Sequence, residues 1–263
     1  MVDASILHSR HPRSFRENLY VYPVVSRRAG GISLGVNLGR DKQCNFRCVY
    51  CQVDRTRPCK AAPVDLDRLA MELEATAIEA KSGRLFAART APSSEAAETT
   101  TLPLQDIAFS GDGEPTAHPQ FAQALEVAAA VRRRLKLFDV RLVVITNSTL
   151  LDQPRVRAAL KTLHENDGVL WCKLDAGTES YHRRVARSPV PLSRIFANLL
   201  SASRSHAMIV QSLFMRMQGE PPQSAELEAY CQLLRELTSS GGRVELVQIH
   251  TVARVPAEPW VEP

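Results

Sequence analysis

The feature that most constrains the fold is an alternation of strand-like and helix-like segments that repeats about six times along the chain. Short segments rich in Val, Ile and Leu are followed by longer segments whose apolar residues recur at the spacing of a helix. This alternation predicts parallel strands joined by right-handed crossovers through helices. The expected strands are residues 32–38, 107–109, 140–145, 169–174, 208–215 and 244–249, and the expected helices are residues 65–80, 121–137, 153–163, 191–203 and 224–239.

Six such units are fewer than the eight of a complete barrel. We therefore predict an α/β fold in the form of a partial (β/α)6 TIM-like barrel with parallel strands, open on one side. A doubly wound open sheet is the alternative that the alternation leaves open. We expect residues 1–30 to be an irregular N-terminal extension and residues 31–263 to form the core domain. Within that domain, residues from about 82 to 103 are expected to be a flexible insertion, because they are rich in Ala, Ser, Thr and Glu.

Composition excludes several classes of protein. With 44% hydrophobic residues in 263, the chain is not disordered throughout. No apolar run approaches the roughly 18–20 residues of a membrane span, and residues 1–18 lack the apolar segment of a secretory signal. We therefore expect a soluble cytoplasmic protein that is not bound to a membrane. The net charge of +5 is concentrated in residues 1–60, which predicts either a surface for phosphate or nucleic acid or a solvated face.

Polar residues follow the expected strands at the points where those strands end. They are the cysteine loop at residues 44–51, residues 110–114, Asn147 with its neighbour, Asp175, and residues 250–251. In parallel α/β folds the functional site lies at the carboxyl ends of the strands. We therefore expect these five segments to converge on one site.

The cysteine loop carries the clearest chemistry. Cys44, Cys48 and Cys51 have the spacing C-x-x-x-C-x-x-C. Thiolates select zinc, copper(I) or iron–sulfur clusters, and both a closed zinc site and an ordinary four-iron cluster take four protein ligands. Three cysteines leave one iron of a cluster open to another molecule, for which a reactive cofactor is the natural candidate. The alternative is a structural zinc site completed by a distant His or Cys.

A second motif follows the expected strand at residues 107–109. It reads Gly111-x-Gly113-Glu114-Pro115. Glycine allows the backbone to approach another group closely, and Glu114 supplies a carboxylate suited to an ammonium group. The alternative is an ordinary surface turn.

Together these motifs resemble the radical S-adenosylmethionine (radical SAM) superfamily, because the three-cysteine loop has Tyr50 before its last cysteine and a Gly-Glu-Pro segment accompanies it. The segments at residues 110–116, 146–150, 174–176 and 247–263 resemble the branch of the wyosine-forming tRNA enzymes, whose members are often described only as iron–sulfur oxidoreductases. The resemblance extends from about residue 36 to the last residue. It implies that the core domain is a radical SAM domain.

The resemblance implies specific roles. Cys44, Cys48 and Cys51 would hold a [4Fe-4S] cluster whose fourth iron binds the amine and carboxylate of S-adenosylmethionine. Further cofactor contacts are implied for Tyr50, Gly113, Glu114, Asn147, Ser148, Asp175 and Val252. The alternative for the polar residues after strands is that they cap the next helix. His250 is either a base that acts on the substrate or a polar residue whose hydrogen bonds are made within the protein. No catalytic residue beyond the cluster ligands is assigned.

The implied reaction is reductive cleavage of S-adenosylmethionine by an electron from a donor such as flavodoxin or ferredoxin, followed by hydrogen abstraction from a substrate. A tRNA base is the suggested substrate, and a peptide or protein, as in activating and maturation enzymes, is the alternative. A non-catalytic RNA-binding module with zinc or an iron–sulfur cluster is the alternative from another class. Residues 1–43 contain no cysteine, so the second cluster of the archaeal wyosine-forming enzymes is not expected.

Overall fold

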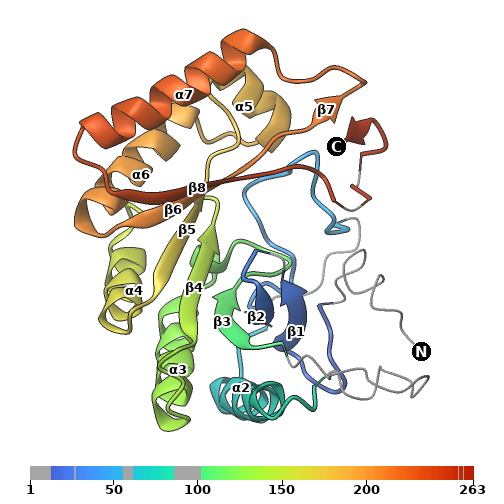
Figure 1. Ribbon diagram of the computed structural model, residues 1–263, viewed down its shortest axis with the longest axis vertical. Helices are drawn as coiled ribbons and strands as arrows, with labels where there is room; N and C mark the ends of the chain where they lie inside the picture. Colours follow the sequence, from blue (N-terminus) through green and yellow to red (C-terminus); the bar gives the residue numbers. More distant parts are fainter. Residues whose placement is uncertain (1–12, 27, 56–61, 86–101, 254, 257) are drawn as a thin grey trace, which may run out of the picture.

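A seven-stranded sheet forms the centre of the molecule (Figure 1). The computed structural model describes residues 13–26, 28–55, 62–85, 102–253, 255–256 and 258–263. The strands lie in the order β1 (Val21–Ser26), β2 (Gly31–Val36), β3 (Leu104–Phe109), β4 (Arg141–Thr146), β5 (Val169–Lys173), β6 (Met208–Leu213) and β8 (Val244–His250).

The topology decides between the two expected architectures. Six strands of this sheet, β2, β3, β4, β5, β6 and β8, are parallel, and their order across the sheet is the same as their order along the chain. A doubly wound sheet reverses its strand order part of the way along, whereas a barrel does not. In the described part of the chain, β1 and β8 are the two edges and do not pair with each other. The prediction of a partial barrel that is open on one side is confirmed.

Helices cover one face of the sheet and pack against its apolar side chains (Figure 1). Outward-facing residues such as Leu34, Phe109 and Leu142 are fully buried in this core together with Leu73 and Leu163 of the helices. Their burial follows from the period of two in each strand and the 3.6-residue period in each helix. The helices are α2 (Leu66–Lys81), α3 (Phe121–Arg134), α4 (Pro154–Glu165), α5 (Glu179–Ala186), α6 (Leu192–Ser205) and α7 (Ser224–Ser239), with a short 3-10 turn η2 (Pro115–Ala117) after β3.

The other face of the sheet is packed more sparsely. Ala108, Val143, Trp171 and Ile209 form a separate small apolar cluster there. These residues alternate with the core residues of the same strands, so they point away from the helices. The inner face therefore has room for a cavity.

The expectation of an irregular extension up to residue 30 is wrong for β1. This strand pairs antiparallel with β2 from Val21 opposite Val36 to Ser26 opposite Gly31. Pro23 looks like a break in the sequence, but an edge strand tolerates proline because one side of its backbone needs no ladder bond. The carboxylate of Glu72 on α2 also accepts backbone N–H groups from residues 19–21, at 2.8 to 3.1 Å.

Three further outcomes concern the rest of the chain. Helix α5 was not expected, because it has only eight residues and a largely polar sequence, although Thr178 caps it by accepting from the backbone N of Tyr181 at 3.2 Å.

Most of the expected insertion at residues 82–103 lies outside the described residues. A search of the described residues finds no helix with the length and apolar character needed to span a membrane.

Candidate functional site

A cavity of about 910 Å³ lies on the inner face of the sheet and at the carboxyl ends of its strands. Its walls include residues 33 and 35 of β2, residue 145 of β4, residue 173 of β5 and residue 211 of β6. These positions alternate with core residues that point toward the helices. Of the ten residues expected to bind the cluster or the cofactor, the following eight line the cavity: Cys44, Cys48, Cys51, Tyr50, Gly113, Glu114, Asn147 and Val252.

The cysteine loop is held against helix α5 by its backbone. The N–H of Arg47 donates to the carbonyl of Ala186 at 2.8 Å, and the N–H of Val49 donates to that of Val185 at 3.0 Å. Val49 is fully buried in a second apolar cluster. That cluster also contains Met215, Met217, Val252 and Val261, and thus the two-stranded sheet of β7 (Arg216–Met217) and β9 (Val261–Glu262). The segment at the C-terminal end of the chain therefore helps to fix the loop.

The three cysteines are free and half-buried, and each sulfur has its own surroundings. The Sγ of Cys44 accepts from the backbone N of Phe46 at 3.4 Å, and the Sγ of Cys51 accepts from Nη1 of Arg55 at 3.0 Å. Burial raises the pKa of the Cys44 thiol, and it raises the pKa of Cys48 to about 12, with the nearby charge of Asp175 as a second cause. Metal binding overcomes such an effect because a coordinating thiol is deprotonated.

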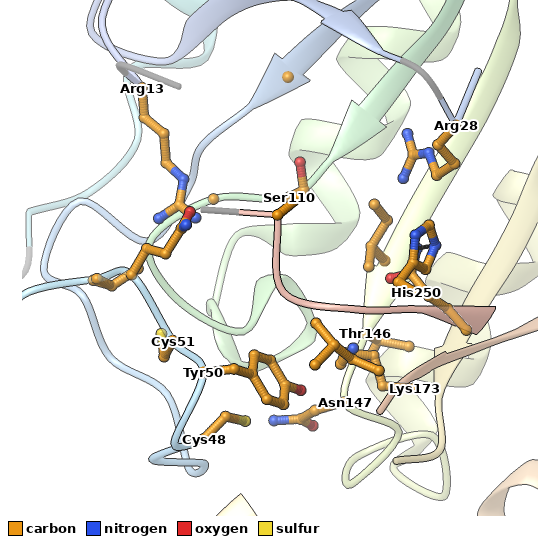
Figure 2. Close-up of a pocket in the computed structure, with 18 of the residues that line it drawn as sticks. Arg13, Arg28, Cys48, Tyr50, Cys51, Ser110, Thr146, Asn147, Lys173 and His250 are labelled. Atoms are coloured by element: carbon orange, nitrogen blue, oxygen red, sulfur yellow. Dashed lines mark hydrogen bonds between the residues drawn. The ribbon is translucent and has the colours of Figure 1, made fainter. Parts of the chain in front are cut away.

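Among the described residues, no three His, Cys, Asp or Glu side chains are grouped so that they could hold one metal ion. The cysteine sulfurs surround one cavity rather than a single point, as Figure 2 shows for Cys48 and Cys51. In an iron–sulfur cluster the thiolates bind different iron atoms, so this donor set fits a cluster.

Glycine brings the Gly-Glu-Pro loop against the cysteine loop. A Cβ on Gly113 would lie 2.3 Å from the carbonyl oxygen of Gln43, and a Cβ on Gly39 would lie 2.7 Å from the backbone N of Gly113. The N–H of Glu114 donates to the same Gln43 carbonyl at 3.1 Å. The close approach expected of Gly113 is therefore made to the neighbouring loop.

The carboxylate of Glu114 is buried and ties its own loop to the end of β4. Its Oε1 accepts from the N and the Oγ1 of Thr116, at 3.1 and 2.6 Å, and from Oγ1 of Thr146 at 2.6 Å. Its Oε2 accepts from the backbone N of Asn147 at 2.8 Å. Burial raises the pKa of Glu114, and these hydrogen bonds oppose the rise. A carboxylate has about four acceptor sites, two on each oxygen, so Oε2 retains capacity for a further donor.

Asn147 connects the end of β4 to the cysteine loop. Its Nδ2 donates to Oδ1 of Asn45 at 2.6 Å and lies 3.8 Å from Sγ of Cys44. Its Oδ1 accepts from the N and the Oγ1 of Thr149, at 3.2 and 2.7 Å. Asn147 therefore shapes the turn after β4 and also faces the cavity (Figure 2).

Two of the expected site residues lie behind the cavity wall. Ser148 is fully buried with a φ of 67°, and its carbonyl accepts from Nδ2 of Asn198 at 2.8 Å. Asp175 is also buried; it accepts a hydrogen bond from the Tyr50 hydroxyl and another from the N of Leu213 at 2.9 Å. Burial raises the pKa of Tyr50 well above its usual value, and the charge of Asp175 adds to the rise. Asp175 thus fixes the ring that faces the cavity.

Sequence reasoning did not identify the cations of the site. Arg13, Arg28, Arg55 and Lys173 all line the cavity. The first three belong to the basic N-terminal region that was expected to face a partner or solvent. For Lys173 a signal existed, since it is two residues from the inward-facing Trp171 on the same strand.

Comparisons with known proteins identify the family of this chain. The model of the Radical SAM superfamily matches residues 42–224. A UPF0026 protein of Helicobacter pylori (strain J99) is 26% identical over 238 residues, which are 89% of this chain and 68% of that protein. A UPF0026 protein of Methanocaldococcus jannaschii is 26% identical over 251 residues, which are 92% of this chain and 65% of that protein.

The chain thus spans about two thirds of the length of these relatives. A solved structure of TYW1 with a lysine-pyruvate adduct bound matches 88% of this chain and 67% of its own, with a TM-score of 0.49 and 16% sequence identity. The superfamily model, in contrast, covers more than half of the chain and includes all three clustered cysteines. The chain therefore belongs to the radical SAM superfamily, whose members are enzymes that use a [4Fe-4S] cluster with S-adenosylmethionine and need an electron donor.

Proposed function

We propose that this chain binds S-adenosylmethionine beside the cysteine loop and directs hydrogen abstraction at a second molecule in the same cavity. When bound, the reduced [4Fe-4S] cluster supplies one electron that cleaves the sulfonium C–S bond and yields a 5′-deoxyadenosyl radical. The observation that carries the proposal is the convergence of the three cysteines with Glu114 and Asn147 on one cavity.

The chain's own residues support a cluster at Cys44, Cys48 and Cys51. Arg55 donates to Sγ of Cys51 and to the carbonyl of Asp112 at 3.1 Å, so its positive charge is fixed beside the ligand set. Hydrogen bonds and charges near the sulfurs tune the reduction potential of a cluster. We propose that Arg55 stabilises the reduced, more negative form.

The cofactor would lie between the Gly-Glu-Pro loop and Tyr50. Glu114 has acceptor capacity left at Oε2 for the methionine amine, and Gly113 leaves room for that approach. Tyr50 and Val252 would flank the adenine, and Asn147 would face the ribose and methionine side. We assign Asp175 and Ser148 to support, because one holds Tyr50 and the other lies buried after β4.

For the domain organisation, we propose one radical SAM domain over residues 31–263. Strand β1 extends the same sheet at its N-terminal edge.

Anaerobic reconstitution with iron and sulfide tests the proposal. We expect a brown protein with about four irons per chain and formation of 5′-deoxyadenosine with dithionite or with a flavodoxin or ferredoxin. Cys48→Ala should lose both, whereas Cys231→Ala, which removes an exposed thiol on α7, should keep both. A colourless protein with one bound zinc would contradict the proposal.

As the substrate, we propose a tRNA base. Arg40 and Arg47 are exposed on and beside the cysteine loop, where they could contact phosphate groups. Phosphate contacts make nucleic-acid binding weaken as salt rises. Affinity for bulk tRNA should therefore fall between low and physiological salt, and Arg40→Gln/Arg47→Gln should reduce that salt dependence. Binding that does not respond to salt would eliminate this substrate.

A peptide is the second candidate, and the edge strand β8 favours it. Within the described residues, β8 pairs with β6 on one side only, and Leu246 and Ile249 are exposed. Its residues 248–250 line the cavity, so a peptide added as the next strand would reach the site. Protection of the β8 amides from hydrogen exchange by a peptide, but not by tRNA, would favour this candidate.

A further inference from the structure

One end of the cavity is chemically distinct from the cysteine end. Figure 2 shows Arg28 and His250 at this end, away from Cys48 and Cys51. Arg28 follows β1, while His250 is the last residue of β8. The two edge strands of the open barrel therefore both supply side chains to this end. We call it the Arg28 subsite.

The guanidinium of Arg28 contacts Trp171 and Asp106, but only part of its hydrogen-bonding capacity is used. It lies over the ring of Trp171, with Cζ 4.6 Å from the ring centroid. Its Nη2 is 3.4 Å from Oδ2 of Asp106, which is longer than the roughly 2.7–2.9 Å of a good charge-assisted hydrogen bond. Asp106 also accepts from the Ser33 hydroxyl. The buried Nε of Arg28 has no hydrogen-bond partner in the described structure.

The charges that line the cavity favour an anion at this end. The lining residues that the structure describes carry four cationic side chains, on Arg13, Arg28, Arg55 and Lys173, and one carboxylate, on Glu114. Three of the cations also pair with carboxylates that do not line the cavity, and the pair of Arg28 with Asp106 is the longest of them, at 3.4 Å. Glu114 already accepts four hydrogen bonds at the cysteine end. An oxyanion near Arg28 would therefore meet the incompletely paired guanidinium, while the one lining carboxylate lies at the cysteine end.

Neutral polar groups complete the subsite. The Nε2 of His250 lies 2.9 Å from Oε1 of Gln248 and 3.2 Å from Nε2 of Gln211. The two glutamines come from neighbouring strands and line the cavity with His250. Amide and imidazole groups donate and accept hydrogen bonds, so they suit the uncharged polar part of a ligand.

The cavity is large for a ligand site. Its volume of about 910 Å³ is near the upper end of the roughly 300–1,000 Å³ of ligand pockets. We propose that the Arg28 subsite binds the carboxylate or phosphate group of a small substrate or co-substrate, beside the cofactor. The assignment rests on the proposed function for the place of the cofactor, but the binding itself requires neither the cluster nor turnover.

Calorimetric titration of the reconstituted protein with S-adenosylmethionine present tests the subsite. Sodium phosphate and sodium malonate are the two probes, used at constant ionic strength. We expect saturable binding of at least one probe, and the tighter one identifies the class of anion. Arg28→Gln should weaken that binding by about tenfold or more, because hydrogen bonds to a charged group are lost. Arg157→Gln is the matched control, since it removes an exposed charge on α4.

Two further variants keep the test decisive. Arg28→Gln leaves Asp106 as a buried charge without its partner, so Arg28→Gln/Asp106→Asn removes both charges if the single variant fails to fold. Arg28→Lys should bind the phosphate or malonate probe with intermediate affinity, since lysine keeps the positive charge but lacks the planar guanidinium group. Unchanged affinity in the variants that lack Arg28, or no saturable binding of either probe to the parent, overturns the proposal. Binding that persists in Cys48→Ala supports the subsite even where the cluster proposal fails.

Discussion

The two faces of the sheet show how one strand serves two purposes. On β3, Ile107 and Phe109 face the helices and are fully buried, whereas Ala108 between them faces the inner side. On β5, Leu170 and Cys172 belong to the main core, whereas Lys173 lines the cavity. Large apolar side chains on the outer face hold the barrel together. The inner face carries a smaller apolar cluster together with polar side chains, and it leaves space for the cavity.

The difference predicts that the outer face carries most of the stability. Phe109→Ala should reduce the free energy of unfolding by about 3–5 kcal/mol, because it deletes a fully buried ring that packs edge-on against Phe121. Urea titration followed by circular dichroism measures the change. The inner-face substitution Ile145→Ala should cost less, since Ile145 borders the cavity. An equal loss in the free energy of unfolding for the two substitutions would show that the outer face does not carry more of the stability than the inner face.

Gly113→Ala tests the contact between the two loops of the inner face. The new Cβ would lie 2.3 Å from a backbone carbonyl of the cysteine loop, so the two loops must separate. We expect a loss of about 1–3 kcal/mol of stability, as for overpacking in a core, together with reduced iron content after reconstitution. Ser110→Ala, which changes a neighbouring residue toward a smaller side chain, is the control. Full iron content in Gly113→Ala would show that the close approach is not needed.

Glu114→Gln examines whether the carboxylate is needed as an acceptor. The new amide NH2 would face groups that are themselves donors, so one or more hydrogen bonds must be lost. The expected cost is about 1–3 kcal/mol in the free energy of unfolding. Affinity for S-adenosylmethionine, measured by calorimetry, should fall as well. If stability falls and affinity does not, Glu114 ties the loops together without contacting the cofactor.

Much of the architecture follows from the sequence because the outer face repeats a simple pattern. The strand around residues 140–145 and the helix around residues 224–239 were expected within a residue or so of where β4 and α7 lie. Strand β1 was missed because Pro23 and the two glycines at residues 30–31 are breaks by local rules. The antiparallel pairing with β2 across a short turn orders residues 21–26, and long-range bonds from residues 20 and 21 to Glu72 anchor the start of the strand.

The inner face was predicted less completely. The cysteines, Tyr50 and Glu114 carry recognisable spacing, and the structure places them around one cavity. Arg28 and Arg13 come from a segment without a motif, and they reach the cavity through the ion pairs with Asp106 and Asp112. Asp175 was expected to contact the cofactor, and this stays a prediction; in the structure it accepts a hydrogen bond from the hydroxyl of Tyr50, which lines the cavity. Which polar residue faces a cavity and which supports it depends on packing between segments far apart in the chain.

The smallest expected effect lies on the outer side of the helices, where His164 stacks on His206 with ring centroids 3.6 Å apart. Burial, as the main cause, and the charges of His206 and Arg243 together lower the pKa of His164 to about 4. Between pH 6.5 and 4 the unfolded chain then binds more protons than the folded one. His164 therefore contributes stability above pH 6.5 that is lost as the pH falls toward 4.

Because His164 is partly exposed, solvent screening limits this loss to about 1 kcal/mol. Urea titrations at several pH values measure it, with Lys161→Gln on the same helix as the control. His164→Gln should flatten the stability profile in that interval. It should leave the binding of phosphate or malonate at the Arg28 subsite unchanged, because the two sites lie on opposite faces of the sheet. A change in that binding would show that the outer face is coupled to the cavity. Stability and ligand binding would then not be separated between the two faces of the sheet.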